Sequence, residues 1–428
     1  MTILFLAHRM AQGFGVAVVL AELSRRLRAA GHRVVVGCIE RDEFFSDLDI
    51  RLTMPTATAV RVLAEDVAAT LVIAHTSPFF ELLPALPPPY VRVVWEHGDP
   101  EPSLFGQDCD ERQAIADHKR LHVYPHVDHV IAISHFIARD IGWPQATVLY
   151  NGCDHVEDRG SKDAGVVASG AGPVRVGTLM RLGKGEAFYK GGDLFLSLMD
   201  QAREAGLDAR FAIMGRGTEE DAAPFLAQGI EVRLNASDAE RAQFLRTLDV
   251  FVSLSLWEGF NLPVVEAQAL GTPALTLDTG AHPEVTPLCL PSLEDILVLV
   301  RAYAADRTVL AEHAGLAYAM VRRRFSWDQA VQEFLALPLA RKAEPEAPVA
   351  AAVPARSGYF WRTGGIFLAL FLAGRFLWRH LWSILPESLH PIRVALSRRA
   401  ALVVICLRSE GLPATIRRIL RRLGKGRL

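Results

Sequence analysis

Several features that define other classes of protein are missing or scarce in this chain of 428 residues. Its five cysteines are scattered and form no C-x-x-C pair, which predicts a reducing compartment and no disulfide framework. The apolar stretch 2–7 is short and has no basic leader, so we expect a first strand there and not a signal peptide. The apolar run 364–374 falls far below the roughly 20 residues that a membrane-spanning helix needs.

A complete dinucleotide-binding fingerprint is also missing. The predicted strand 3–7 leads into a loop with Gly13 and Gly15, and a helix is expected over residues 16–30. The fingerprint G-x-G-x-x-G needs a third glycine and an acid after the second strand, here residues 33–38. Neither is evident, which argues against a nicotinamide-dependent dehydrogenase.

Short apolar, β-branched runs alternate with helical patterns along most of the chain. The predicted strands include residues 3–7, 33–38, 71–74, 90–95, 130–134, 174–179, 211–214 and 250–254. This alternation predicts two doubly wound α/β domains, each with a parallel sheet covered by helices on both faces. We place them at residues 1–157 and 173–339, joined by a hinge linker at 158–172 that is rich in glycine, serine and alanine.

The stretch 249–274 carries most of the functional information. A buried strand at 250–254 is followed by a loop that contains Gly259, and Pro263 suits the first turn of a short helix that ends before Gly271. Glu258 lies in the loop and Glu266 one turn into the helix. Because helical side chains tilt toward the N-terminus, we expect both carboxylates to face the helix start.

A helix start of this kind favours a phosphate group. The free N–H groups of Phe260, Asn261 and Leu262 and the helix dipole attract an anion, and one carboxylate can accept from a ribose diol while the other accepts from sugar hydroxyls. This arrangement suits a nucleotide-sugar. A glutamate in a first helical turn, considered alone, is more often a helix cap or a dipole partner, and this alternative applies to Glu266.

The complete string is more specific. Glu258-Gly259-Phe260-Asn261-Leu262-Pro263, then Glu266, then Gly271-Thr272-Pro273 closely resembles the Glu-x7-Glu signature of the family-four retaining glycosyltransferases. The resemblance covers about residues 1–337 and implies the GT-B fold, in which an acceptor domain faces a nucleotide-sugar domain across a cleft. It implies that Glu266 binds the ribose and that Glu258 contacts the donor sugar. It also implies a reaction that needs neither a metal nor another cofactor.

The same resemblance assigns further site residues. It places His97, at the end of the predicted strand 90–95, near the reacting sugar, and it makes Arg181 and Lys190 the cations that offset charge on the departing diphosphate. Lys184 competes with Lys190 for that role because the spacing from Arg181 is longer than usual, and either cation could also be a solvated surface charge. Gly15 is expected to face the diphosphate and Gly215 the nucleotide base. An Asp-x-Asp pair at Asp108 and Asp110 looks like a metal motif of another glycosyltransferase fold, but no apolar strand precedes it.

Charge is distributed unevenly. Residues 356–428 hold 14 Arg and Lys against Glu387 and Glu410, a charge of +12. Since the whole chain carries −2, the remaining residues carry −14. A linker rich in alanine, proline and glutamate (340–356) leads into this basic extension (357–428).

The end of the basic extension has an amphipathic pattern. One apolar stripe consists of Ile416, Ile419, Leu420 and Leu423, and arginines and a lysine fill the opposite face. The pattern predicts an interfacial helix that binds an anionic membrane surface. The alternative is a helix that packs on the protein's own acidic body. No motif that reads nucleic acid accompanies the basic charge, so a nucleic-acid partner is not expected.

We therefore predict a retaining glycosyltransferase that uses a UDP-, GDP- or ADP-linked sugar and a glycan or lipid-linked acceptor. We expect it to be cytoplasmic and peripheral on the inner face of the cell membrane. Two alternatives remain open, a GT-B sugar-nucleotide epimerase or hydrolase and a non-catalytic protein that binds nucleotide-sugars. Intact Glu258, Glu266, Arg181 and His97 argue against the second.

Overall fold

A computed structural model describes residues 1–157, 172–183 and 186–342 of the chain. These residues fall within one compact unit, Met1–Ala343. Almost all of the predicted hinge linker (158–172), most of the linker 340–356, the whole basic extension 357–428 and the competing Lys184 lie outside the described residues.

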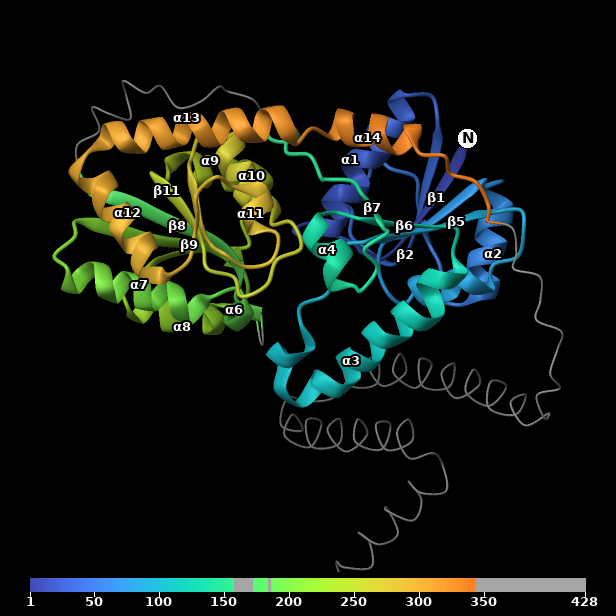
Figure 1. The fold of residues 1–428 in the computed structure, drawn as a ribbon, viewed down its shortest axis with the longest axis horizontal. Coiled ribbons are helices and arrows are strands. Elements are labelled where there is room, and N and C mark those ends of the chain that lie inside the picture. Colours follow the sequence, from blue (N-terminus) through green and yellow to red (C-terminus); the bar gives the residue numbers. More distant parts are fainter. Residues whose placement is uncertain (158–171, 184–185, 343–428) are drawn as a thin grey trace, which may run out of the picture. The chain divides into compact units, whose positions relative to one another are not determined.

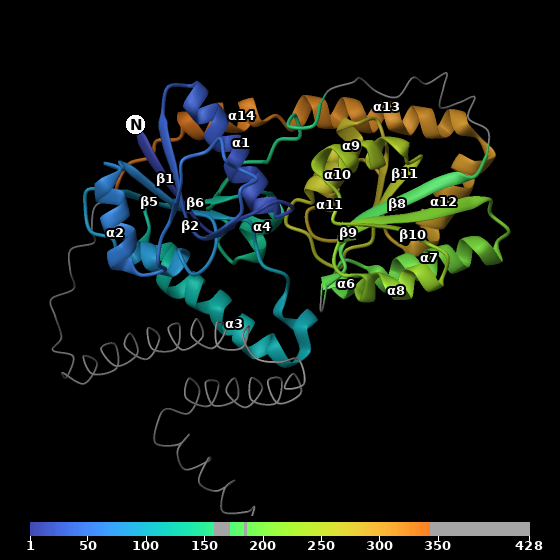
Figure 2. The same ribbon diagram turned by 180° about the vertical axis from the view of Figure 1, so that it is seen from behind.

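The N-terminal domain is built on a sheet of seven parallel strands in the order β3-β2-β1-β4-β5-β6-β7 (Figures 1 and 2). Its strands are β1 (Thr2–Met10), β2 (Arg33–Arg41), β3 (Ile50–Leu52), β4 (Leu71–Ala74), β5 (Val91–Glu96), β6 (His129–Ala132) and β7 (Thr147–Val148). Every residue of β4 is buried, as expected for a central strand with helices on both faces.

The C-terminal domain repeats this plan with six parallel strands in the order β10-β9-β8-β11-β12-β13. Its strands are β8 (Val174–Arg181), β9 (Ala209–Arg216), β10 (Glu231–Leu234), β11 (Val250–Ser253), β12 (Ala274–Leu277) and β13 (Cys289–Leu290). In chain order both sheets begin with the pattern 3-2-1-4-5-6 of doubly wound domains. The predicted fold class is therefore confirmed.

Helices connect the strands at the positions that the sequence pattern favours. The helices are α1 (Gly15–Ala29), α2 (Ala57–Asp66), α3 (Cys109–His118), α4 (His135–Asp140), α6 (Glu186–Tyr189), α7 (Gly192–Glu204), α8 (Glu219–Ala227), α9 (Asp238–Thr247), α10 (Leu262–Ala269), α11 (His282–Val285), α12 (Leu293–Ala305), α13 (Arg307–Arg324) and α14 (Trp327–Ala336). Side-chain caps fix several starts, among them Ser134 at α4 and Ser237 at α9. None of the described helices is long and apolar enough to cross a membrane.

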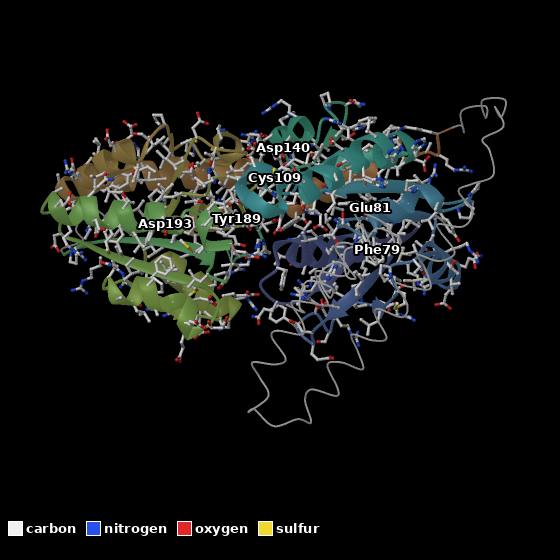
Figure 3. The ribbon with its side chains drawn as sticks, turned by 90° about the horizontal axis from the view of Figure 1, so that it is seen from below. Phe79, Glu81, Cys109, Asp140, Tyr189 and Asp193 are labelled. Atoms are coloured by element: carbon white, nitrogen blue, oxygen red, sulfur yellow. The ribbon has the colours of Figure 1, made fainter. Side chains whose placement is uncertain are left out.

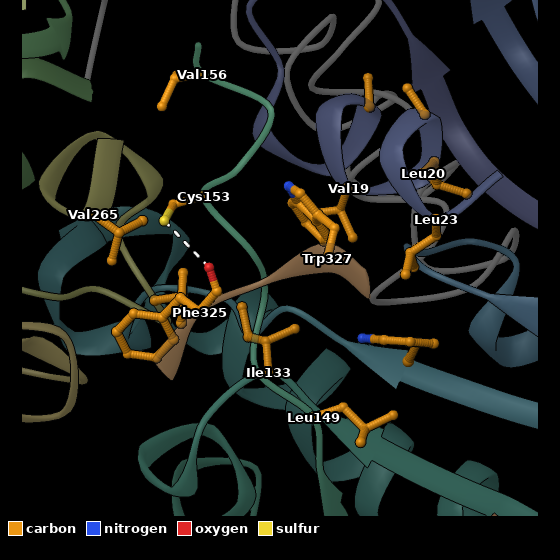
Figure 4. Packing of buried hydrophobic residues seen from close by; sticks show 14 of the residues in the cluster. Val19, Leu20, Leu23, Ile133, Leu149, Cys153, Val156, Val265, Phe325 and Trp327 are labelled. Carbon is orange, nitrogen blue, oxygen red and sulfur yellow. Dashed lines mark hydrogen bonds between the residues drawn. The ribbon is translucent and has the colours of Figure 1, made fainter. Parts of the chain in front are cut away.

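The two domains share a core at the hinge. Helix α13 packs on α10, and α14 crosses back and packs on α1 of the N-terminal domain (Figure 1). At the crossing, the Cys153 thiol donates to the carbonyl oxygen of Phe325 at 3.2 Å, and Trp327 is buried beside Val19 (Figure 4). The two domains are therefore packed together at the hinge. The carboxyl ends of both sheets are not part of this contact and line the candidate active site.

Candidate active site

A cleft of about 660 Å³ lies between the carboxyl ends of the two sheets. That volume is within the range of small-molecule sites. Its N-terminal wall includes the loop after β1, Thr76 after β4 and His97 after β5, and its C-terminal wall includes the ends of β8 and β9 and the loop between β11 and α10. Of the predicted residues, the cleft is lined by Gly15, His97, Arg181, Lys190, Gly215, Glu258, Gly259, Phe260, Asn261 and Leu262.

The loop between β11 and α10 has the predicted form. Pro263 lies in the first turn of α10, and Gly271 follows the helix with a φ of +80° that glycine adopts without strain. Gly280 packs so closely that an added Cβ would lie 2.3 Å from the carbonyl oxygen of Glu258. The amide of Ala281 donates to that same oxygen at 2.9 Å. The backbone of Glu258 is therefore positioned by the segment between β12 and α11.

Glu258 forms an ion pair with the predicted cation Lys190. The Nζ atom of Lys190 donates to Oε1 of Glu258 at 2.7 Å, and the Glu258 side chain is only 9% exposed. Burial opposes ionisation, but the charge of Lys190, together with contributions from His282 and from hydrogen bonds of Lys190 and Ser255, outweighs burial and lowers the pKa of Glu258 below its usual value. The cleft therefore contains a fixed carboxylate with an ammonium beside it.

The turn that carries Lys190 packs against the loop between β11 and α10. The amide of Leu256 donates to the carbonyl oxygen of Tyr189 at 2.7 Å. Gly191 has a φ of +77°, and an added Cβ would lie 2.2 Å from the carbonyl oxygen of Leu254. Backbone contacts thus set the position of Lys190, whereas Lys184 lies outside the described residues.

Glu266 differs from expectation because it does not line the cleft. It is fully buried, and its Oε1 accepts from Nε2 of His155 at 2.8 Å and from Arg241 at 3.2 Å. Burial raises the pKa of this carboxyl, but Arg241 and His155 outweigh burial and bring the pKa to about 2. Its Oε2 accepts no hydrogen bond from a described residue, and the NH1 atom of Arg241 lies 3.2 Å from it in the ion pair.

Two helix starts meet in the cleft. An added Cβ at Gly15, the first residue of α1, would lie 3.8 Å from Cδ1 of Leu262, the first residue of α10. Within the described chain, the N–H groups of Phe260, Asn261 and Leu262 have no hydrogen-bond acceptor. The side chain of Asn261 points away, donating to Ser253 at 2.9 Å. Free donors and the positive ends of two helix dipoles favour an anion at this point.

Arg181 projects from the end of β8 into the cleft. Its Nε pairs with Glu186, and its NH2 donates to the hydroxyl of Tyr189 at 3.2 Å. The Tyr189 ring in turn packs on Phe105, which precedes α3, with ring centroids 5.8 Å apart; Figure 3 labels Tyr189 and, at the start of α3, Cys109. Contacts from both domains therefore orient Arg181.

His97 is half-buried and lies next to a second histidine, His75, which is fully buried. Its Nε2 lies 3.0 Å from Nδ1 of His75, which directly follows β4, and the rings of His75 and Trp95 are stacked. Burial lowers the pKa of His97 to about 4 and that of His75 well below its usual value. Both rings are therefore neutral at pH 7, and His97 presents a neutral ring to the cleft.

Two glycines of the site are required by close backbone contacts. An added Cβ at Gly259 would lie 2.5 Å from the carbonyl oxygen of His97, and one at Gly215 would lie 2.0 Å from that of Met180. The first contact joins the two domains across the cleft, since His97 belongs to the N-terminal domain. The predicted roles of these glycines in donor binding stay predictions.

The described residues contain no group of three or more His, Cys, Asp or Glu side chains that could hold a metal ion. Asp108 precedes α3 and Asp110 lies in its first turn, and neither lines the cleft. Metal independence of the reaction therefore stays a prediction.

Sequence reasoning missed several residues of this site, among them His75, His155 and Arg241. His75 could have been found, because it follows a central strand just as His97 does. His155 and Arg241 have no such signal. They reach Glu266 from 111 and 25 residues away in the sequence, and only the packed fold brings them together.

Comparison with known families covers both domains. Residues 15–157 match the model described as Glycosyltransferase Family 4, and residues 176–292 match the model described as Glycosyl transferases group 1. The first match begins at Gly15 and contains His97, and the second contains Arg181, Lys190, Glu258 and Glu266. The predicted site residues thus all lie inside the matched regions.

Two curated relatives match part of the chain. The lipopolysaccharide core biosynthesis mannosyltransferase LpsB of Rhizobium meliloti is 30% identical over 171 residues, 35% of this chain and 47% of its own. The phosphatidyl-myo-inositol mannosyltransferase of Mycobacterium leprae is 32% identical over 120 residues, 27% of this chain and 32% of its own. The chain thus spans about half the length of the first relative and a third of the second.

The fold is also found in solved structures. Sucrose-phosphate synthase from Thermosynechococcus elongatus superimposes with a TM-score of 0.63 at 14% identity, covering 78% of this chain and 97% of that structure. At this identity the likeness concerns the fold alone. From the two matched domain models and the shared GT-B fold, the chain belongs to the family 4 (group 1) glycosyltransferases.

Proposed function

We propose that the protein is a retaining glycosyltransferase, which moves a sugar from a nucleotide-sugar to an acceptor hydroxyl. The observation that carries the proposal is the convergence, in one cleft, of Arg181, the Lys190–Glu258 pair and the starts of α1 and α10. Cations and free N–H groups suit a diphosphate, and a fixed carboxylate suits sugar hydroxyls.

In the proposed reaction, the acceptor oxygen bonds to the anomeric carbon while the bond from that carbon to the diphosphate oxygen breaks. The proton of the acceptor hydroxyl passes to the departing phosphate on the same face of the sugar, which gives retention. Negative charge grows on the diphosphate as it leaves. Arg181 and the helix starts stabilise that charge, and because they are already in place they stabilise the transition state more than the bound donor.

The protein holds the donor at its other end through carboxylates. We propose that Glu258 accepts hydrogen bonds from the transferred sugar and that Oε2 of Glu266, which accepts none from a described residue, accepts one from the ribose. The neutral ring of His97 contacts the reacting sugar. Two similar relatives are named as mannosyltransferases, so nucleotide-linked mannose is the first donor to test.

The test combines binding with product analysis. We expect UDP, GDP or ADP to raise the melting temperature, since a ligand at 100 times its dissociation constant adds about 2.7 kcal/mol of stability. The matching nucleotide-sugar should then glycosylate an acceptor with retained configuration, as read by NMR. Arg181→Ala should lower kcat roughly 10²–10³-fold with a smaller change in KM. Turnover that is fast without acceptor would favour a hydrolase, and conversion of the donor to another nucleotide-sugar would favour an epimerase.

We further propose that residues 356–428 hold the enzyme on the inner face of the cell membrane, where a lipid-linked acceptor would be presented. Support comes from the sequence: their charge is +12 beside −14 for the rest of the chain. Each Lys or Arg near an anionic surface contributes about 1 kcal/mol, so several contacts suffice for peripheral attachment. The full chain should pellet with anionic vesicles, less so with neutral vesicles or in salt, whereas a chain that ends at Ala343 should not. Equal pelleting of both chains would reject this anchor.

A further inference from the structure

Two arginines meet at the carboxyl ends of neighbouring strands. In the register of β8 and β9, Arg181 is directly opposite Arg216, and both residues line the cleft. Like charges placed opposite each other in a sheet are destabilising. Arg181 is bonded to Glu186 and Tyr189, whereas the guanidinium of Arg216 makes no hydrogen bond or ion pair with any described residue. The half-buried guanidinium of Arg216 therefore has no anionic partner among the described residues.

The backbone on either side of Arg216 is firmly held. Gly215 approaches the carbonyl oxygen of Met180, and the amide of Leu182 donates to the carbonyl oxygen of Arg216 at 2.8 Å. On the other side, Asn235 bonds Gly217 twice, accepting from its amide at 3.3 Å and donating to its carbonyl oxygen at 2.9 Å. An unpaired side chain on so rigid a backbone is typical of a binding group.

Arg216 also reaches the other domain. Gly13 lies in the loop between β1 and α1 with a φ of +79°, and an added Cβ there would lie 1.9 Å from Nε of Arg216 and 2.4 Å from Cζ. The guanidinium therefore lies directly against the backbone of the glycine loop, with its N–H groups in the cleft near the start of α1. Any side chain at position 13 would displace it.

We propose that Arg216 binds the diphosphate of the nucleotide together with Arg181, and that the glycine loop of the N-terminal domain holds its guanidinium in place. The inference rests on the proposed function and deepens it. It makes Arg216 the residue that favours a nucleoside diphosphate over a monophosphate, because the second phosphate adds the charge that two adjacent arginines can share.

The test measures dissociation constants by calorimetry for UDP, GDP and ADP and for the corresponding monophosphates. Arg216→Ala should weaken the best-bound diphosphate about tenfold or more and its monophosphate less than threefold. Arg210→Ala is the matched control. Arg210 is exposed at the opposite end of β9, opposite Arg175, and its removal changes the net charge of the same strand equally.

A second pair of variants tests the role of the glycine loop. Gly13→Ala should cost about as much diphosphate affinity as Arg216→Ala, and the double variant should lose no more than either one, because both changes remove the same interaction. Gly31→Ala controls for backbone strain. Gly31 has a φ of +85° beyond the other end of α1, and an added Cβ would meet nothing within 4 Å.

Each result has a defined meaning. Selective loss of diphosphate affinity, with non-additive Gly13 and Arg216 changes, supports the proposal. Equal weakening of diphosphate and monophosphate, or none, overturns the inference about Arg216 while wild-type binding still supports the proposed function. A wild-type protein that binds none of the six nucleotides overturns both.

Discussion

The Nδ1 atom of His75 lies 3.0 Å from the Nε2 atom of His97 in the N-terminal wall of the site, where His75 is buried and His97 is half-buried. One nitrogen must donate to the other. Nε2 of His75 has no partner among the described residues. A buried N–H without an acceptor is rare in proteins, so we place the proton of His75 on Nδ1 and that of His97 on its own Nδ1. In the proposed reaction, His97 is then a hydrogen-bond donor of fixed tautomer.

This pair predicts a loss of stability in mild acid. Burial lowers the pKa of both histidines, that of His97 to about 4. A group whose pKa is lowered on folding stabilises the protein fully above its unfolded pKa, and this contribution is lost as the pH falls toward the folded pKa. For His97 the window runs from about pH 6.5 to about pH 4.

Urea unfolding at pH 7.5 and pH 5 measures this effect. Between pH 7.5 and pH 5, we expect the free energy of unfolding to fall by roughly 2 kcal/mol less in His97→Gln than in the wild type, because glutamine has no proton to take up. His118→Gln is the control, since His118 is exposed on α3 and should leave the wild-type loss unchanged. Equal losses for wild type and His97→Gln would contradict a neutral His97.

The Lys190–Glu258 pair predicts an asymmetry between single and double variants. Lys190→Met leaves the buried Glu258 carboxylate without its partner, and breaking a buried pair in this way costs about 3–5 kcal/mol. Lys190→Met combined with Glu258→Gln removes both charges and should be more stable than Lys190→Met alone. Urea unfolding of the four proteins of the cycle gives the coupling energy. A coupling energy near zero would mean that solvent already screens the pair.

Glu266 has a role that a ribose analogue can test. Its Oε2, which accepts no hydrogen bond from a described residue, should accept from a ribose hydroxyl in a charge-assisted bond worth about 1.5–3 kcal/mol. Glu266→Ala should therefore abolish or greatly weaken nucleotide binding in calorimetry. The 2′-deoxy or 3′-deoxy nucleotide that lacks the bonded hydroxyl should bind the wild type more weakly, but bind Glu266→Ala no worse than the parent nucleotide does. A dissociation constant for Glu266→Ala within twofold of wild type would exclude the role.

The sequence predicts the local parts of this molecule well and the long-range parts poorly. The strand, loop and helix around Glu258 follow from Pro263, Gly271 and a buried apolar run, which are local signals. The orientation of Glu266 could not be predicted, because helix geometry points it toward the cleft whereas His155 and Arg241 cover it. Such partners come from other elements, and a single sequence does not pair them.

The last prediction concerns a contact that joins the two domains on the hinge side. Glu284 in α11 accepts from the backbone amides of His135 at 3.0 Å and Phe136 at 2.7 Å, at the start of α4, and from the hydroxyl of Tyr150 at 2.8 Å. The guanidinium of Arg324 donates to the Glu284 carbonyl oxygen at 2.9 Å and to the Tyr150 hydroxyl at 3.0 Å. One carboxylate from the C-terminal domain thus satisfies two amides of the N-terminal domain.

Glu284→Ala should free these amides and loosen the domains from each other. We expect the free energy of unfolding in urea to be about 1–3 kcal/mol lower than that of the wild type. X-ray scattering should show a larger radius of gyration. Glu333→Ala is the control: Glu333 lines the same hinge surface on α14, is exposed, and accepts from Gln329 within its own helix. If Glu284→Ala and Glu333→Ala gave the same scattering curve, the hinge core around Trp327 would be sufficient to hold the domains, and Glu284 would only cap α4.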